Sequence, residues 1–152
     1  MDRTVTEVRA FVQNVHEGQA DELGRPLMEH LEAVRERVAQ MGGEDADQIA
    51  ALLHHALSDG RVTAEQLAGF ELPDRSRAIV DALTRRAEES EDDQLRRVME
   101  TPGAVRVLRA DLAHQLHPDR LRCCSAAERE LTLHRCCRIL VELDKEPELT
   151  FR

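Results

Sequence analysis

The stretch PLMEHLEAVRERVAQMGG, residues 26–43, decides the fold class. Its apolar residues return every three or four positions, which is the spacing of one helix face. They are Leu27, Leu31, Val34 and Val38. Pro26 is typical of a first helical turn and Gly42-Gly43 of a stop, so the stretch predicts a helix of about 15 residues. His30 falls in the first turns of that helix.

The same spacing returns almost throughout the chain. It predicts further helices over residues 5–17, 45–57, 63–70, 74–83, 92–99, 105–116 and 125–143. We find no useful alternating strand pattern and no internal repeat, so we expect an all-α orthogonal multi-helix bundle. A chain of 152 residues suits one domain, 1–152, with a core over about 5–145. The segment 146–152 is short and is expected to fray.

Composition limits the classes of partner. Lys and Arg total 21 against 30 for Asp and Glu, giving a formal net charge of -9, so we expect no nucleic-acid partner. No stretch approaches the roughly 20 apolar residues of a membrane span, and the N-terminus lacks a signal-peptide pattern. We therefore expect a cytoplasmic protein with no membrane partner. Three Phe and no Trp or Tyr leave few aromatic faces for a nucleobase.

Four residues are candidate metal ligands. His30, His54, His55 and Asp111 each fall on a predicted helix, near an end or a break. Imidazole and carboxylate are usual ligands for divalent ions such as Mn, Fe and Zn, and helical bundles build metal sites from facing side chains. The pattern alone leaves two interpretations open: a metal site, or surface and hydrogen-bonded core residues without an ion.

Three segments carry a family resemblance. HEGQADELGRPLMEH (16–30) is similar to the motif H-x-G-Q-x-D-x-x-G-x-P-Y-x-x-H, and ALLHHALSDGRVT (51–63) is similar to A-L-L-H-D-x-x-E-D-T-x-x-T. The third segment, VDALTRR (80–86) with VLRADLAHQ (107–115), is similar to a motif ending V-K-L-A-D-L-A-D-N. Together they resemble the hydrolase domain of RelA/SpoT-type (p)ppGpp hydrolases and small stand-alone HD-domain phosphohydrolases. The resemblance covers roughly residues 5–145.

The resemblance implies a divalent metal ion that activates water for attack on a phosphate ester. It places the ligands on His30, His54, His55 and Asp111, with His55 in place of the Asp of the His-Asp pair. Three histidines and one carboxylate are softer and less negative than the family's set, which favours Zn or Fe over Mn. The family's acidic pair is reduced to Ser58-Asp59, leaving Asp59 as the catalytic acid near the water.

The resemblance also implies residues that bind substrate. Arg25 and Arg85 match positions where the family is often basic, and Gln115 stands where the family has Asn. Leu108 stands in place of a Lys. We expect a small phosphorylated ligand, a nucleotide or another phosphate ester. The alternative is a catalytically inactive HD-fold pseudoenzyme that binds a ligand or a protein partner, which the combined departures favour.

Other residues leave open interpretations. Cys123-Cys124 and Cys136-Cys137 could bind zinc or act as a redox sensor, but adjacent cysteines lack the C-x-x-C spacing, and core packing is favoured. Cys137 fits a core stripe of the last helix with Leu133, Leu140 and Val141. His114 is a further candidate ligand or proton carrier, or an exposed residue.

Overall fold

The computed structural model of the chain describes residues 3–145. Within that range every regular element is a helix, and one isolated bridge pairs Ala20 with Pro26. In chain order the helices are α1 (Val5–Val15), α2 (Leu27–Gln40), α3 (Asp45–Leu53), α4 (Ala64–Ala68), α5 (Asp74–Leu83), α6 (Glu91–Glu100), α7 (Ala104–Gln115), α8 (Pro118–Arg122) and α9 (Ala126–Asp144). The predicted all-α multi-helix bundle is confirmed. The expected fraying of 146–152 lies outside the described residues.

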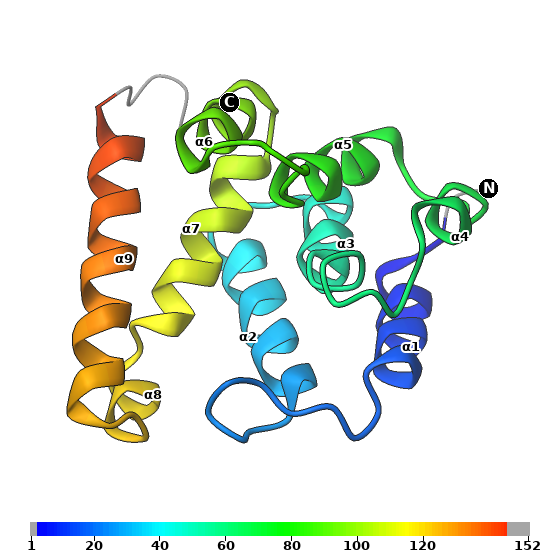
Figure 1. The fold of residues 1–152 in the computed structure, drawn as a ribbon. Coiled ribbons are helices and arrows are strands. Elements are labelled where there is room, and N and C mark those ends of the chain that lie inside the picture. The colour runs from blue at the N-terminus through cyan, green and yellow to red at the C-terminus, as the bar shows by residue number, and fades with distance from the viewer. Residues whose placement is uncertain (1–2, 146–152) are drawn as a thin grey trace.

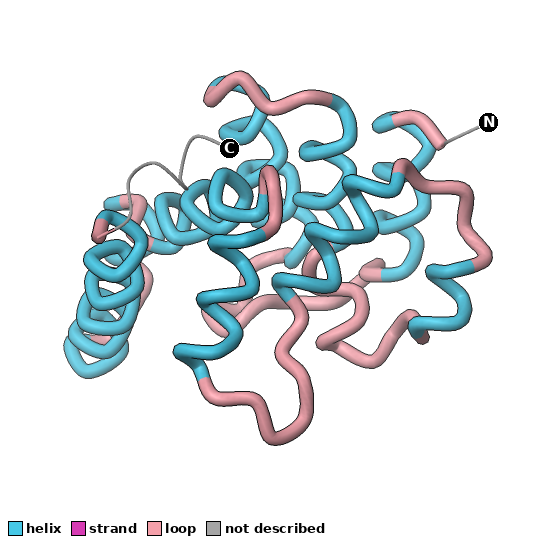
Figure 2. Tube along the Cα trace, turned by 90° about the horizontal axis from the view of Figure 1, so that it is seen from above, coloured by secondary structure: helices cyan, strands magenta, loops and turns pink. Residues whose placement is uncertain are grey.

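Three helices form the centre of the bundle. α2 packs against both α3 and α7, while α1 and α5 pack on α3 (Figure 1). Their facing sides carry fully buried apolar residues such as Leu31, Val34, Leu52, Ile79 and Val107. In the view from above, loops alone join the helices of the described part (Figure 2). No helix among residues 3–145 has the length and apolar run needed to cross a membrane.

The end of α3 differs from the prediction. The helix stops at Leu53 instead of Leu57, and residues 54–60 form turns. The ring Nδ1 of His54 lies 2.5 Å from the carbonyl oxygen of Ala51, which in a continued helix would accept from His55 N–H. Gly60 then turns the chain with a φ of +72°. His54 and His55 therefore lie in a turn that leaves the helix, which sequence periodicity could not distinguish from one more helical turn.

A buried ion-pair network ties α3 to α5 and α7. The carboxylate of Asp47 on α3 is fully buried and accepts from Arg75 Nε at 2.6 Å and from Arg106 Nη1 at 3.3 Å. Gly103 begins α7 beside this network with a φ of +87°, and a Cβ atom there would lie 2.7 Å from Asp47 Oδ1. The predicted break at Pro102-Gly103 thus requires a glycine for two reasons, backbone conformation and space.

The C-terminal part departs furthest from the prediction. The short helix α8 was not predicted, because five residues carry no periodic signal. The predicted core stripe on α9 is wrong for three of its four residues: Cys137 and Leu133 are exposed and Val141 is 57% exposed, whereas Leu140 is partly buried against the core. Cys136 and Leu143 are the fully buried residues instead. α9 lies at the edge of the bundle beside α7, so a narrow strip of its surface is covered (Figure 1).

Candidate metal centre

The four candidate ligands meet in one cluster. His30 comes from α2, His54 and His55 follow α3, and Asp111 lies on α7, so the central packing of these helices brings them together. One donor atom from each residue lies within 4.8 Å of all the others. His30 Nε2 is 2.9 Å from Asp111 Oδ1, and His54 Nε2 is 3.7 Å from Asp111 Oδ2. Among residues 3–145 no other group of His, Cys, Asp or Glu side chains has this arrangement.

Hydrogen bonds behind the cluster orient the rings. The His54 Nδ1–H donates to the carbonyl of Ala51, which turns its Nε2 toward Asp111. His30 Nδ1 lies 2.6 Å from His114 Nδ1, so an Nδ1–H on a neutral His30 ring that donates to His114 leaves Nε2 without a proton and able to bind a metal ion. Metal-binding histidines are held in this way, with the second ring nitrogen hydrogen-bonded away from the ion. His114 therefore fits a positioning role for His30.

Burial and neighbouring charges keep two of the four candidate ligands, His55 and Asp111, free of protons. Burial, together with repulsion from His54, lowers the pKa of His55 to about 4. Burial opposes ionisation of Asp111, but the adjacent His30 and His54 rings outweigh it and hold the pKa of this carboxyl well below its usual range. Burial also disfavours a charged His54, but Asp111 outweighs it and raises the pKa of His54. Near neutral pH the cluster thus offers a carboxylate and a neutral His55 ring.

The cluster meets a test for a metal ion. His54 Nε2 and His55 Nε2 are buried and have no hydrogen-bond partner, since the 3.7 Å contact from His54 to Asp111 is too long for a hydrogen bond. Buried polar atoms without partners are costly and rare in folded proteins. A divalent ion among the four side chains would satisfy both nitrogens, and three imidazoles with one carboxylate suit Zn or Fe.

A hollow of about 360 Å³, here called the polar hollow, opens beside the cluster. Asp59 and Gln115, both predicted site residues, line it with His30, His55 and Asp111. Asp59 Oδ2 accepts from the amide of Gln19 at 2.9 Å. Gln115 donates to Asp111 Oδ1 at 3.2 Å, so it holds a ligand of the cluster in place as well as facing the hollow.

Two arginines of the polar hollow were not predicted. Arg120 comes from α8 and Arg135 from α9. Arg120 Nη1 pairs with Asp21 Oδ2 at 2.9 Å, and both side chains are largely buried. Arg135 donates to the neutral Oε1 of Gln115. The motifs end before both residues, and α8 gave no helical signal, so the sequence offered no basis for placing them.

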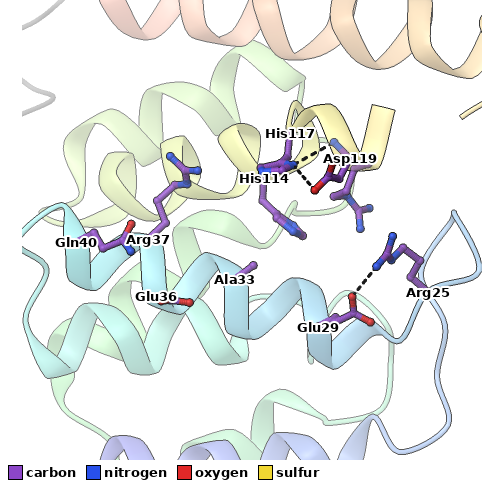
Figure 3. A pocket seen from close by; sticks show the side chains of 10 residues that line it. Arg25, Glu29, Ala33, Glu36, Arg37, Gln40, His114, His117 and Asp119 are labelled. Carbon is purple, nitrogen blue, oxygen red and sulfur yellow. Dashed lines mark hydrogen bonds and ion pairs between the residues drawn. The ribbon is translucent and has the colours of Figure 1, made fainter. Parts of the chain in front are cut away.

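The two arginines proposed from the resemblance do not line the polar hollow. Arg85 is an exposed residue that follows α5. Arg25 lines a separate hollow of about 370 Å³ between α2 and α8, where its guanidinium pairs with Glu29 at 2.9 Å (Figure 3). His114 also lines this second hollow, so its ring lies between the hollow and His30.

The cysteine pairs do not gather into a metal site. In the described part of the chain no cluster of potential metal ligands includes a cysteine. Cys136 is buried with its Sγ 3.8 Å from Gln115 Oε1, whereas Cys123 and Cys137 are exposed. The interpretation as core packing therefore holds for Cys136 and fails for Cys137.

No protein-family model matches the chain, and the search of curated proteins returned no match. The resemblance to HD-domain phosphohydrolases therefore stays a prediction.

Proposed function

We propose that this protein is a metal-dependent phosphohydrolase of the HD type, with a divalent ion held by His30, His54, His55 and Asp111. The observation that carries the proposal is the convergence of these ligands within 4.8 Å, together with buried nitrogens of His54 and His55 that lack partners. The three sequence motifs support it independently, because they predicted the same four residues. Zn and Fe suit the donor set better than Mn.

The chemistry would be hydrolysis of a phosphate ester. A divalent ion supplies Lewis acidity, which polarises a phosphoryl oxygen and makes water a nucleophile at neutral pH. Asp59 lines the polar hollow with its side chain partly open to solvent, where it accepts a proton from the attacking water. The water oxygen bonds to phosphorus and the ester P–O bond breaks. The leaving oxygen takes up a proton from solvent and departs as the alcohol, and Asp59 returns to solvent the proton that it took from the attacking water.

The surrounding residues would hold the substrate and the ligands. Arg135 faces the hollow and can neutralise a phosphoryl oxygen. Gln115 accepts from Arg135 and donates to Asp111. It therefore links the position of the Arg135 guanidinium to that of the metal-binding carboxylate of Asp111. His114 keeps His30 in the orientation that points Nε2 into the cluster.

One observation favours the alternative, a pseudoenzyme that binds a ligand or a protein partner without turnover. Ser58, which stands where the family has an acid, is placed so that its hydroxyl donates to the carbonyl of His55 at 3.3 Å. A backbone carbonyl does not activate a hydroxyl as a general base would, so Ser58 cannot replace the missing carboxylate. Metal binding without hydrolysis of any phosphate ester would support this alternative.

The test is hydrolysis of p-nitrophenyl phosphate by protein loaded with Zn, Fe or Mn. We expect a metal-dependent rate that falls by about 100-fold or more in Asp59→Asn, the usual contribution of an acid-base group, and that is lost in His55→Ala. The matched control is His134→Ala, which removes an exposed histidine of α9 outside the cluster and should leave the rate unchanged. A rate that persists in His55→Ala would contradict the proposal.

A further inference from the structure

A third hollow, apolar in its lining, includes two residues of the same cluster, His54 and Asp111. It measures about 140 Å³ and lies among α5, α6, α7 and α9. We call it the apolar hollow, because five of the side chains that line it are aliphatic: Leu83, Leu95, Val98, Leu108 and Ile139. His54, Glu91, Gln94 and Asp111 complete its lining. The family motif has a Lys where Leu108 stands, so this departure adds to the apolar character of the hollow.

The apolar hollow adjoins the candidate metal centre. Asp111 lines both this hollow and the polar hollow, and His54 joins the apolar hollow to the cluster. The other polar residues at its rim are engaged: Gln94 donates to the carbonyl of Leu83 at 3.1 Å, and Glu91 pairs with Arg138. The buried Nε2 of His54 has no hydrogen-bond partner. A molecule in the apolar hollow would therefore touch aliphatic carbon along its length and the cluster at one end.

The charges that line the polar hollow limit how much negative charge on a bound phosphate it can neutralise. Its lining includes the carboxylates of Asp21, Glu22, Asp59 and Asp111. Of its two arginines, Arg120 is already paired with Asp21. Arg135 donates to the neutral amide oxygen of Gln115, so its charge is not paired with a carboxylate of the hollow. One guanidinium and a divalent ion suit one phosphoryl group, whereas a chain of phosphates needs several cations.

Apart from the histidine rings of the candidate metal centre, the two hollows offer no aromatic surface for a nucleobase. No Phe lines either of them. Two of the three Phe in the chain, Phe11 and Phe70, pack on each other with ring centroids 4.6 Å apart. Base recognition without sequence-specific hydrogen bonds rests mainly on aromatic stacking. The lining of the described site thus favours an aliphatic or small aromatic group over a nucleoside.

Building on the proposed function, we propose that the substrate class is a phosphate monoester of a compact apolar alcohol. The phosphoryl group lies in the polar hollow beside Arg135, and the apolar body lies in the apolar hollow between α6, α7 and α9. A cavity of about 150 Å³ lined by aliphatic side chains holds a benzene ring. The apolar hollow is of similar size. The body is therefore a short alkyl chain or a single ring.

The experiment uses alkylphosphonates, which keep the anionic group and cannot be hydrolysed as esters. Methyl- to pentylphosphonate are titrated calorimetrically into the metal-loaded protein. We expect affinity to rise about fourfold for each added methylene, the factor that corresponds to burial of about 0.8 kcal/mol. In a spectrum of Ile δ1-methyl groups, pentylphosphonate should shift the signal of Ile139. The chain has two other isoleucines, Ile49 and Ile79, both buried in the core, and their signals should stay in place.

A variant with a larger side chain in the apolar hollow tests whether the apolar body of the ligand binds there. Ile139→Phe should abolish the dependence on chain length. Val141→Phe on the same helix is the matched control, since Val141 is 57% exposed and does not line the hollow, and it should keep the dependence. Bound metal is measured in every sample.

Each outcome bears on one of the two proposals. Metal bound with a flat chain-length series, or with Ile139 unshifted in the wild-type protein, overturns the apolar substrate class alone. Absence of bound metal overturns the proposed function first. Because the wild-type series and spectrum need no variant, a misfolded Ile139→Phe protein would still leave the inference open to refutation.

Discussion

Replacing Asp47 by alanine tests how firmly the helices beneath the candidate metal centre are held together. Asp47 is fully buried on α3 and accepts from Arg75 of α5 at 2.6 Å and from Arg106 of α7 at 3.3 Å. It also accepts from the backbone N–H of Glu44 at 3.1 Å. The change leaves two guanidinium groups without their carboxylate at the junction of three helices. Two of these helices, α3 and α7, position His54, His55 and Asp111.

The expected magnitude follows from the exposure of the partners. Removing one member of a buried ion pair costs about 3–5 kcal/mol. The side chains of Arg75 and Arg106 are 35% and 24% exposed, so water takes over part of their solvation, and we expect about 3 kcal/mol. In a domain of this size each kcal/mol lowers Tm by about 2–4 °C, so Tm should fall by about 6–12 °C.

The assay is urea and thermal unfolding followed by circular dichroism. The matched control is Asp45→Ala on the same helix, where an exposed carboxylate is lost from the first turn. That change removes a favourable interaction with the helix dipole, about 0.3–1 kcal/mol. Equal losses for the two variants, or a loss below about 1 kcal/mol for Asp47→Ala, would refute the assignment of Asp47 as the junction between the helices.

Three further predictions follow. Zinc at a free concentration of about 1,000 times its Kd should raise the free energy of unfolding by about 4 kcal/mol; a thermal scan whose Tm is the same with zinc and with EDTA would contradict a site of this kind. The pKa of His55 is lowered to about 4, so the unfolded chain binds more protons between pH 6.5 and 4, and the metal-free protein should lose stability as the pH falls through this window. The raised pKa of His54 acts in the opposite direction above pH 6.5, because well below this value the ring is protonated in both the folded and the unfolded chain. Urea unfolding at pH 7 and pH 5 is therefore compared with His55→Gln, which should show about 2 kcal/mol less acid destabilisation, and an identical pH dependence would be evidence against the lowered pKa of His55. Gly103→Ala should destabilise the protein by about 1–3 kcal/mol, because a Cβ atom meets Asp47 in a backbone conformation that L-residues avoid; Gly60→Ala, with similar φ and open space, should cost less, and equal costs in urea unfolding would argue against the steric part.

Periodicity predicted the helices whose apolar faces enter the core. α2 agrees with its prediction because Leu27, Leu31, Val34 and Val38 all face α3 and α7 and are buried. On α9 the same method chose three exposed residues together with Leu140, which packs against the core. Apolar residues on several sides of that helix allow more than one stripe, and the packing of α9, mainly against α7, decides which residues are covered.

The candidate ligands were predictable because motif positions survive small errors in helix boundaries. His54 and His55 were expected near the C-terminal end of a helix and lie in the turn that follows it, yet they still meet His30 and Asp111. The motifs could not predict which other side chains surround the four ligands. Arg135 enters the polar hollow because of how α9 docks, a tertiary contact that no local pattern encodes.

His114 is another residue whose role could not be predicted from the sequence. From the sequence it could have been a ligand, a proton carrier or an exposed residue. The structure places its Nδ1 2.6 Å from His30 Nδ1, and burial with repulsion from His30 lowers the pKa of His114 to about 4. A neutral ring that accepts a hydrogen bond from His30 fits none of the three expectations. The sequence could not show this contact, because His30 lies on α2, 84 positions earlier in the chain.

The most direct test of the metal centre is the metal content of protein purified without a metal-affinity column, measured by mass spectrometry for the wild type, His55→Ala and His134→Ala. The account predicts about one divalent ion per chain in the wild type and in His134→Ala, and a large loss in His55→Ala, since His55 supplies one of the four ligands. Wild-type protein that binds no ion even when zinc is added, or a His55→Ala variant that binds as much as the wild type, would contradict it.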